Sequence, residues 1–175
     1  MTSPARQRAG FTLLELIAVV TIVLILIFLF VGVARRLPGI ADRVVCTGNL
    51  RALHVGFETY VQDNNHWPKV PRFGPNGSEA EGEWWIRTMA PYDIPEKAWQ
   101  CPAIIRLGKI QQNGTTPKIH YAPMIFDQRP RTPYLWPNQP WLVEIANVHG
   151  HGALCILPDG SVKDWDKHFA EHLAR

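Results

Sequence analysis

Hydrophobic and polar positions divide the chain into two unlike parts. Between Phe11 and Ala34 nearly every residue is apolar, and this stretch of about 24 residues is long enough to cross a bilayer core of roughly 30 Å as a helix. The rest of the chain is polar, aromatic and proline-rich, and the whole sequence contains 15 Pro and 13 Gly. The pattern predicts a membrane-spanning helix and one compact domain with many turns.

A second helical pattern follows Pro38 and Gly39, which we expect to bend or break the first helix just beyond the membrane. Apolar residues there recur at spacings of four, three, four and three, which is typical of one stripe on an amphipathic helix. Asp63, the two asparagines after it and Pro68 are expected to end this helix. The stripe consists of Cys46, Leu50, Leu53, Phe57 and Tyr60.

The middle of the chain predicts short elements joined by loops. Residues 70–83 are rich in proline, glycine and acidic side chains and indicate a loop, whereas residues 84–89 favour a short helix. Residues 119–126 and 141–146 have the apolar and aromatic content of strands.

The C-terminal part predicts a β-hairpin. Residues 153–157 and 161–165 flank Pro158-Asp159-Gly160, which is a strong turn signal. Asp164 or Asp166 could cap a short helix that ends at Arg175. Antiparallel strands laid on one long helix would give an α+β fold.

Glu15 is the only formal charge inside the apolar stretch, where a charge costs a few kcal/mol or more. A secretory signal peptide with a cleavage site at residues 32–34 fits poorly, because the apolar run is too long and contains a carboxylate. A plain single-pass anchor fits the length but gives Glu15 no role.

The segment Gly10–Glu15, with the sequence GFTLLE directly before the apolar run, resembles the processing site of type IV pilins and type II secretion pseudopilins. The resemblance implies that a prepilin peptidase cuts after Gly10 on the cytoplasmic side and that the new N-terminal Phe11 is N-methylated. It also implies that Glu15 meets the N-terminal amine of a neighbouring subunit when the helices pack into a filament. Such an ion pair would lower the cost of both charges in an apolar bundle.

The resemblance implies a structural subunit and not an enzyme, with a lollipop layout. Its parts would be the leader, the transmembrane and assembly helix, the amphipathic helix and a globular β-rich domain, at residues 1–10, 11–34, 35–63 and 64–175. The implied partners are the prepilin peptidase and methyltransferase, other pilin or pseudopilin subunits, membrane lipid, and an inner-membrane assembly platform with a separate ATPase. We expect a role in type II-like protein secretion, with adhesion or DNA uptake by a pilus left open.

The implied location is the inner membrane, with the C-terminal domain in the periplasm or outside the cell. The basic residues oppose this orientation. Arg35, Arg36 and Arg43 follow the apolar stretch, whereas only Arg6 and Arg8 precede it, so the positive-inside rule would place the domain in the cytoplasm. We follow the motif, because cleavage after the leader requires the leader to be inside.

Later parts of the chain resemble one branch of these proteins. Its members carry a Cys-x-x-Asn-Leu stretch, a Tyr-x-x-Asp-Asn helix end and a Cys-Pro, which correspond to positions 46–50, 60–64 and 101–102. The branch usually ends in Asp-Gly-His-Val, and this chain has Ser161 in place of the histidine. Residues 129–140 lie outside the resemblance.

The three cysteines, Cys46, Cys101 and Cys155, cannot all pair within one chain, and none forms a C-x-x-C motif. Buried free thiols and one disulfide both remain open. An oxidising compartment would favour a bridge, for which Cys46 and Cys101 are the candidates.

His149-Gly150-His151 is the first candidate metal site, because a His-x-His pair can supply two ligands and Glu144 and Asp159 are near in sequence. The alternative is a glycine-rich turn with solvent-facing histidines. No H-E-x-x-H motif or third fixed ligand supports zinc.

Calcium is the second candidate ligand, as in some secretion pseudopilins, and Asp159, Asp164 and Asp166 could supply oxygens. Turn formation and helix capping explain the same residues, and the EF-hand spacing is absent. No nucleotide-binding glycine motif and no catalytic triad is visible in the sequence. The net charge of +3 is scattered, so no run of like charges indicates nucleic acid.

The 7 tryptophans all lie beyond the apolar stretch, and we expect most of them to form the core. Trp136 and Trp141, flanked by prolines, are candidates for a recognition surface. Such a surface would suit the alternative function, a membrane-tethered envelope domain that binds metal or glycan, or a hydrolase.

Overall fold

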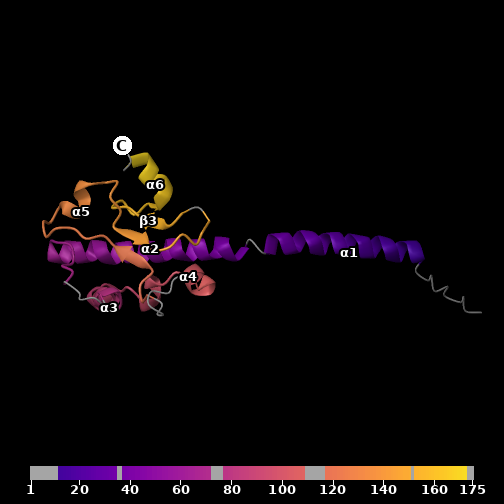
Figure 1. Ribbon diagram of the computed structural model, residues 1–175, viewed down its shortest axis with the longest axis horizontal. Helices are drawn as coiled ribbons and strands as arrows, with labels where there is room; N and C mark the ends of the chain where they lie inside the picture. Colours follow the sequence, from indigo (N-terminus) through magenta and orange to yellow (C-terminus); the bar gives the residue numbers. More distant parts are fainter. Residues whose placement is uncertain (1–11, 35–36, 72–76, 109–116, 151, 173–175) are drawn as a thin grey trace, which may run out of the picture. The chain divides into compact units, whose positions relative to one another are not determined.

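The computed structural model describes residues 12–34, 37–71, 77–108, 117–150 and 152–172. Its contacts divide the chain into two compact units, Met1–Pro38 and Gly39–Arg175. Figure 1 labels the elements of both units along the chain.

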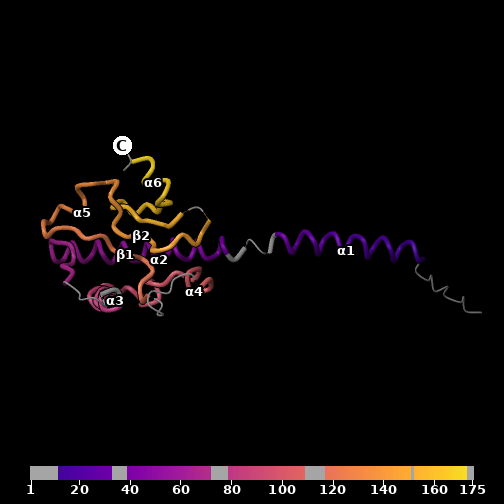
Figure 2. Tube along the Cα trace, viewed as in Figure 1, coloured from indigo at the N-terminus to yellow at the C-terminus, as the bar shows by residue number. Residues whose placement is uncertain are grey.

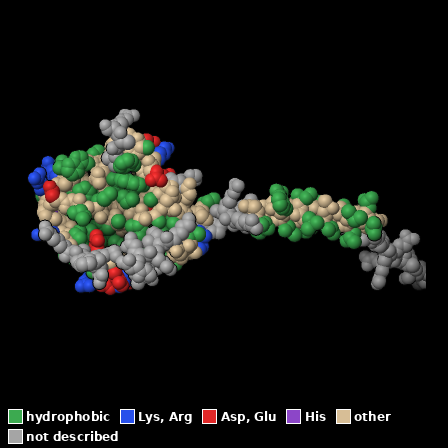
Figure 3. Space-filling view, viewed as in Figure 1, with side chains coloured by type: hydrophobic (Ala, Val, Ile, Leu, Met, Phe, Trp, Pro, Cys, Tyr) green, Lys and Arg blue, Asp and Glu red, His purple; other side chains and the backbone are tan. Residues whose placement is uncertain are grey.

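The first unit contains helix α1, Leu13–Ala34. Within it, Leu13–Gly32 is long and apolar enough to cross a membrane by length and composition, with a mean hydropathy of 3.2, and it is the one helix of the described residues that meets these limits. None of this span is buried, and Figure 3 shows hydrophobic side chains along it. Side chains that avoid water therefore cover α1, as the sequence predicts for a membrane helix.

Helix α2, Leu37–Asn64, opens the second unit and buries the predicted stripe except for its last residue, Tyr60, which is half-buried against the core. Pro38 and Gly39, expected to break a helix, lie in its first turn, where the missing N–H of proline leaves no helical bond unmade. The helix ends as predicted, because Asn65 adopts a left-handed φ of 57° and donates its N–H to the carbonyl of Val61 at 2.9 Å.

A four-stranded antiparallel sheet, ordered β1-β2-β3-β4, confirms the α+β class. Each strand lies within a segment that the sequence predicts to be extended. The strands are β1 Tyr121–Pro123, β2 Leu142–Glu144, β3 Leu154–Ile156 and β4 Val162–Asp164.

One face of this sheet packs against α2. Tyr121 pairs with Glu144, and Leu142 pairs with Ile156, so these side chains share a face because strand residues alternate in direction. Cys155 pairs with Val143 and belongs to the opposite face. Figure 2 traces β1 and β2 across α2.

Short helices complete the second unit. In Figure 1, α3 and α4 lie on one side of α2, and β3, α5 and α6 lie on the other. Arg43 of α2 pairs with Asp164 of β4 at 2.6 Å, and Arg106 of α4 pairs with Asp42 of α2. The bounds are α3 Gly77–Met89, α4 Pro102–Leu107, α5 Thr132–Leu135 and α6 Trp165–His172, with 3₁₀ turns at Ala90–Tyr92 and Glu96–Trp99.

The prediction of a loop over residues 70–83 is wrong in its last part, because α3 begins at Gly77. The first half of α3 is rich in glycine and glutamate and has little apolar periodicity. Its second half anchors the helix in the core, where the ring of Trp85 lies 5.4 Å from that of Phe57 and Met89 is fully buried. Tertiary packing, which the sequence pattern does not show, therefore sets the length of this helix.

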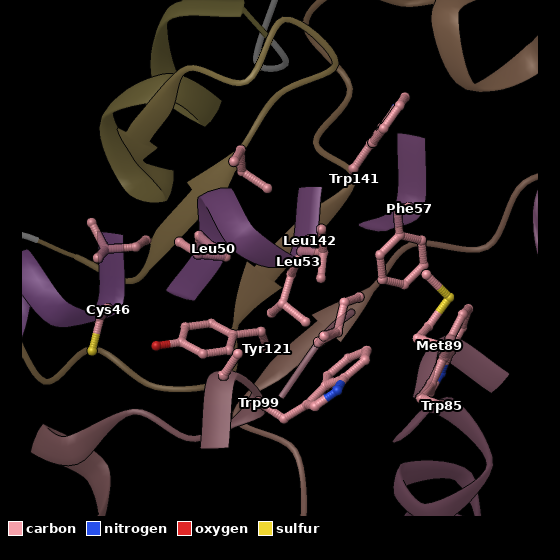
Figure 4. Close-up of a cluster of buried hydrophobic side chains, with 14 of the residues drawn as sticks. Cys46, Leu50, Leu53, Phe57, Trp85, Met89, Trp99, Tyr121, Trp141 and Leu142 are labelled. Atoms are coloured by element: carbon pink, nitrogen blue, oxygen red, sulfur yellow. The ribbon is translucent and has the colours of Figure 1, made fainter. Parts of the chain in front are cut away.

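Most tryptophans form the core, as predicted, and Figure 4 shows several of them around α2. Trp67, Trp85, Trp99 and Trp141 are all fully buried. The prediction of Trp141 as a recognition surface is therefore wrong, and its indole N–H donates to the Pro133 carbonyl at 2.9 Å. Trp136 remains 55% exposed.

Candidate functional site

Glu15 lies in the first turn of α1, one turn from Thr12, and the two residues cap the helix together. The backbone N–H of Thr12 donates to the Glu15 carboxylate at 2.9 Å, and the N–H of Glu15 donates to the Thr12 hydroxyl at 3.3 Å. This reciprocal arrangement is a capping box, which satisfies two backbone donors that a helix start leaves free. The sequence contains its Thr-x-x-Glu signature.

The surroundings of Glu15 are apolar and open. Leu14 is 77% exposed and Leu16 is 57% exposed. Among the described residues, no basic group pairs with the Glu15 carboxylate. The helix thus presents one carboxylate at the start of an uncovered apolar surface. Gly10 and Phe11, the predicted processing and methylation residues, lie outside the described residues.

A second cluster lies inside the domain and joins four segments that are distant in sequence. Potential metal-ligand atoms of Cys46, Cys101, Glu144 and His149 all lie within 4.8 Å of one another. The sulfurs of the two cysteines are 2.7 Å apart, and His149 Nε2 lies 3.7 Å from Cys101 Sγ and 3.2 Å from Glu144 Oε1. The side chains of Glu144 and His149 are fully buried.

Each member of this four-residue cluster is placed by a different element. Cys46 belongs to the apolar stripe of α2, and Cys101 is the residue before α4. Glu144 is the last residue of β2, and His149 lies in the segment between β2 and β3. The cluster therefore forms only when the helix, the sheet and the α4 segment are assembled.

Burial and close contacts shift the protonation equilibria of the cluster. Burial raises the pKa of Glu144 to about 8. The hydrogen bond between the two thiols lowers the pKa of Cys46, and the same hydrogen bond, together with burial, raises the pKa of Cys101. The site holds two thiols, one carboxyl group and one imidazole, which is a donor set suited to a soft or borderline metal ion.

The structure brings some of the predicted metal-ligand residues together and gives others different partners. His149 and Glu144 meet, but His151 lies outside the described residues. Asp159 accepts a bond from the Ser161 N–H at 2.9 Å within the turn, and Asp164 pairs with Arg43. These two carboxylates have structural partners, so a calcium site built on them stays an expectation.

Cys46 and Cys101 are the candidates for a disulfide, and their sulfurs lie next to each other in the structure. All three cysteines are nevertheless free thiols there. In the sequence these two cysteines and His149 are candidates for separate sites. The spacings between them are too long for a local metal motif, and the folding of the sheet against α2 brings them together with Glu144.

Comparison with known proteins identifies one family feature. Residues 5–31 match the model of the prokaryotic N-terminal methylation motif. No curated protein and no solved structure matches the chain.

The methylation motif confirms the resemblance inferred from residues 10–15 and is consistent with a prepilin-type leader. It supports a type IV pilin-like or pseudopilin subunit, and it points to a structural subunit instead of an enzyme. It also implies processing by a prepilin peptidase and assembly with other pilin subunits. The apolar α1 helix fits the membrane anchor of such a protein.

Proposed function

We propose that this protein is a pseudopilin or minor pilin that waits in the inner membrane as a single-pass protein and is assembled into a periplasmic pseudopilus or a pilus. One observation carries the proposal. The methylation motif, residues 5–31, covers most of an apolar, uncovered helix whose single acidic residue is Glu15. A helix of this kind needs both a lipid environment and a partner for its carboxylate.

The proposed processing supplies that partner. Cleavage after Gly10 creates a new amine on Phe11, which is then N-methylated and keeps its positive charge. In a filament the amine of one subunit would lie against the Glu15 carboxylate of its neighbour. In a medium of low dielectric constant an unpaired charge is costly, so the pair would fix the register of adjacent helices.

The orientation follows from the same step, with the leader in the cytoplasm and the domain in the periplasm or outside the cell. Arg43 was one of three residues that argued for the opposite orientation. In the structure its guanidinium pairs with Asp164, so it serves the fold of the domain.

Type II-like protein secretion is the proposed setting. The partners would be the prepilin peptidase and methyltransferase, the other pseudopilins, membrane lipid, and the assembly platform with its separate ATPase. The domain would project from the filament and present its exposed surface to these partners or to cargo.

Three variants separate the assembly role of Glu15 from its capping role. Glu15→Gln keeps an oxygen that can complete the capping box but removes the charge. Thr12→Ala removes the hydroxyl of the box but keeps the charge. We expect Glu15→Gln and Glu15→Ala to insert in the membrane normally and to lose filament incorporation at least about tenfold, because a pairing of more than 1.4 kcal/mol is lost. Thr12→Ala should be incorporated nearly as well as the wild type.

The measurement is the fraction of subunit recovered in sheared or cross-linked filaments, in cells that carry the assembly machinery. Membrane insertion is measured in parallel by carbonate extraction. Normal incorporation of Glu15→Gln would contradict the proposed pairing and would favour a tethered envelope domain, for which Glu15 serves only as a cap.

A further inference from the structure

The cluster of Cys46, Cys101, Glu144 and His149 is independent of the membrane helix and of the proposed assembly function. We infer that these four residues form a zinc site that holds the domain together. The inference rests on the convergence of four metal-binding side chains, whose ligand atoms lie within 4.8 Å of one another in the interior of the domain.

Two of the distances within the cluster match those of a tetrahedral zinc site. Zinc binds sulfur at about 2.3 Å and nitrogen or oxygen at about 2.0–2.2 Å, so ligand atoms around it lie roughly 3.3–3.8 Å apart. The distances from His149 Nε2 to Cys101 Sγ and to Glu144 Oε1 are 3.7 Å and 3.2 Å. The two sulfurs, 2.7 Å apart, would have to separate by about 1 Å, which requires the side chain of one or both cysteines to rotate when zinc binds.

A divalent cation would suit the chemistry of the cluster. Glu144 is 2% exposed, so its carboxyl group either stays protonated or is compensated by a positive partner. The hydrogen bond between His149 and Glu144 accounts for these two groups and does not explain the two adjacent thiols. A divalent ion bonded to both sulfurs, which release their protons to solvent, satisfies all four groups together.

A disulfide explains less of the arrangement. It would join Cys46 to Cys101 but would not explain why a buried carboxylate and a buried imidazole both point at the sulfurs. Four protein ligands in a closed, buried site are typical of structural zinc, whereas a catalytic zinc keeps one position for water.

The surroundings of the cluster hold the proposed ligands in place. The second oxygen of Glu144 accepts the N–H of Leu154 at 3.2 Å. The backbone N–H of Cys101 donates to His120 Nδ1 at 2.9 Å, which fixes the segment before α4. Tyr121 pairs with Glu144 across the sheet, and Figure 4 shows its hydroxyl directed toward Cys46. Such contacts orient the first ligands of a metal site.

The zinc site would cross-link elements that also meet in the hydrophobic core. It binds the first half of α2 to the start of α4 on one side and to the end of β2 on the other. The segment between β2 and β3, which carries His149, would gain a fixed anchor. Loss of zinc should therefore lower the stability of the whole domain and not of one loop.

The test uses the full-length protein in detergent micelles, purified without reductant and without added metal. Metal content is measured by elemental mass spectrometry, and free thiols are counted in denaturant with a chelator. We expect about one zinc per chain and three free thiols. A chelator should lower the melting temperature of the wild type, and added zinc should restore it. Cobalt in place of zinc should give the absorption bands of a tetrahedral thiolate site.

Matched variants locate the site. Cys46→Ser and His149→Gln should lower zinc affinity at least about tenfold. Cys155→Ser and His168→Gln change a buried cysteine and a buried histidine outside the cluster and should retain the metal. If the cluster variants fail to fold, the chelation and cobalt results on the wild type still decide.

Three results would overturn the inference. One free thiol and no zinc would show a Cys46–Cys101 disulfide. Three free thiols, no zinc and no effect of added zinc on melting would show a pair of buried thiols beside a His149–Glu144 ion pair. Zinc that is retained by both cluster variants would place the metal elsewhere. None of these results depends on cleavage after Gly10, so the proposed function stands or falls separately.

Discussion

The carboxylate of Glu15 completes the first turn of its own helix by accepting the Thr12 N–H. A helix cap contributes about 1 kcal/mol, whereas an unpaired charge in lipid costs a few kcal/mol. A neighbour's amine should therefore outcompete the cap when subunits assemble. The capping box would hold the side chain near the helix start until the amine of another subunit arrives.

Cys155 differs from the two cysteines of the cluster, because it lies on the face of the sheet that points away from α2. It pairs with Lys163 on the neighbouring strand. Burial raises its pKa from 9.0 to about 11. The unfolded chain therefore loses this proton first, and stability falls as pH rises from 9 toward 11. From about pH 8 to about pH 10 the wild type should lose roughly 1 kcal/mol more than Cys155→Ala.

The difference is measured by denaturant unfolding of the two proteins across this pH range. A matching experiment follows alkylation of Cys155 near pH 8, which should be slow in the folded protein and fast in denaturant. Equal pH dependence in the wild type and Cys155→Ala would contradict the burial of a protonated thiol.

At the scale of elements, α2 organises the domain, and its two interior glycines have opposite environments. A Cβ added at Gly48 would meet nothing within 4 Å, whereas one added at Gly56 would contact the end of the Ile94 side chain too closely. Gly48→Ala should therefore stabilise the domain by about 0.5–1 kcal/mol through helix propensity. Gly56→Ala should destabilise it by about 1 kcal/mol or more, because Ile94 must move.

Ile94→Val provides the control, since it removes the methyl group nearest to the added Cβ. The double variant Gly56→Ala with Ile94→Val should lose less stability than the sum of the single variants. Thermal unfolding in detergent followed by near-ultraviolet circular dichroism measures each effect. Additive losses would show that helix α2 and the Ile94 segment do not pack as described.

The sequence predicts the elements whose signals are local. The apolar stripe on α2 places Leu50 and Leu53 in the core, and Pro158-Asp159-Gly160 marks the β3–β4 hairpin. The sequence does not indicate the start of α3 at Gly77, because the core contacts of this helix come from its second half, where Trp85 and Met89 are buried. Local periodicity finds an element when its own residues carry the pattern, and it fails when distant packing sets the boundary.

The sequence predicts the four-residue cluster only in part, for the same reason. His149 and Glu144 are near in sequence, so the sequence alone suggests them as a pair of ligands. Cys46 and Cys101 are 55 residues apart and come together with Glu144 only through the packing of α2, α4 and the sheet. Ligands that belong to separate elements leave no spacing motif in a sequence.

At the scale of the whole molecule, the two units have different tasks. The first carries the methylation motif and an uncovered apolar helix, and the second has its own core and the proposed zinc site. In the proposed function, the first unit inserts into the membrane and makes the filament contacts. The second unit presents the surface that would meet secretion partners.

The central claim is that the chain is processed as a prepilin, and the mass and N-terminal sequence of the protein from its native membrane test it most directly. The account predicts a mature chain that begins at N-methylated Phe11, with the leader of residues 1–10 removed. A chain that still begins at Met1 would contradict processing and favour a tethered envelope domain. A chain that begins at Arg35 would show ordinary signal cleavage and an exported domain without a membrane helix.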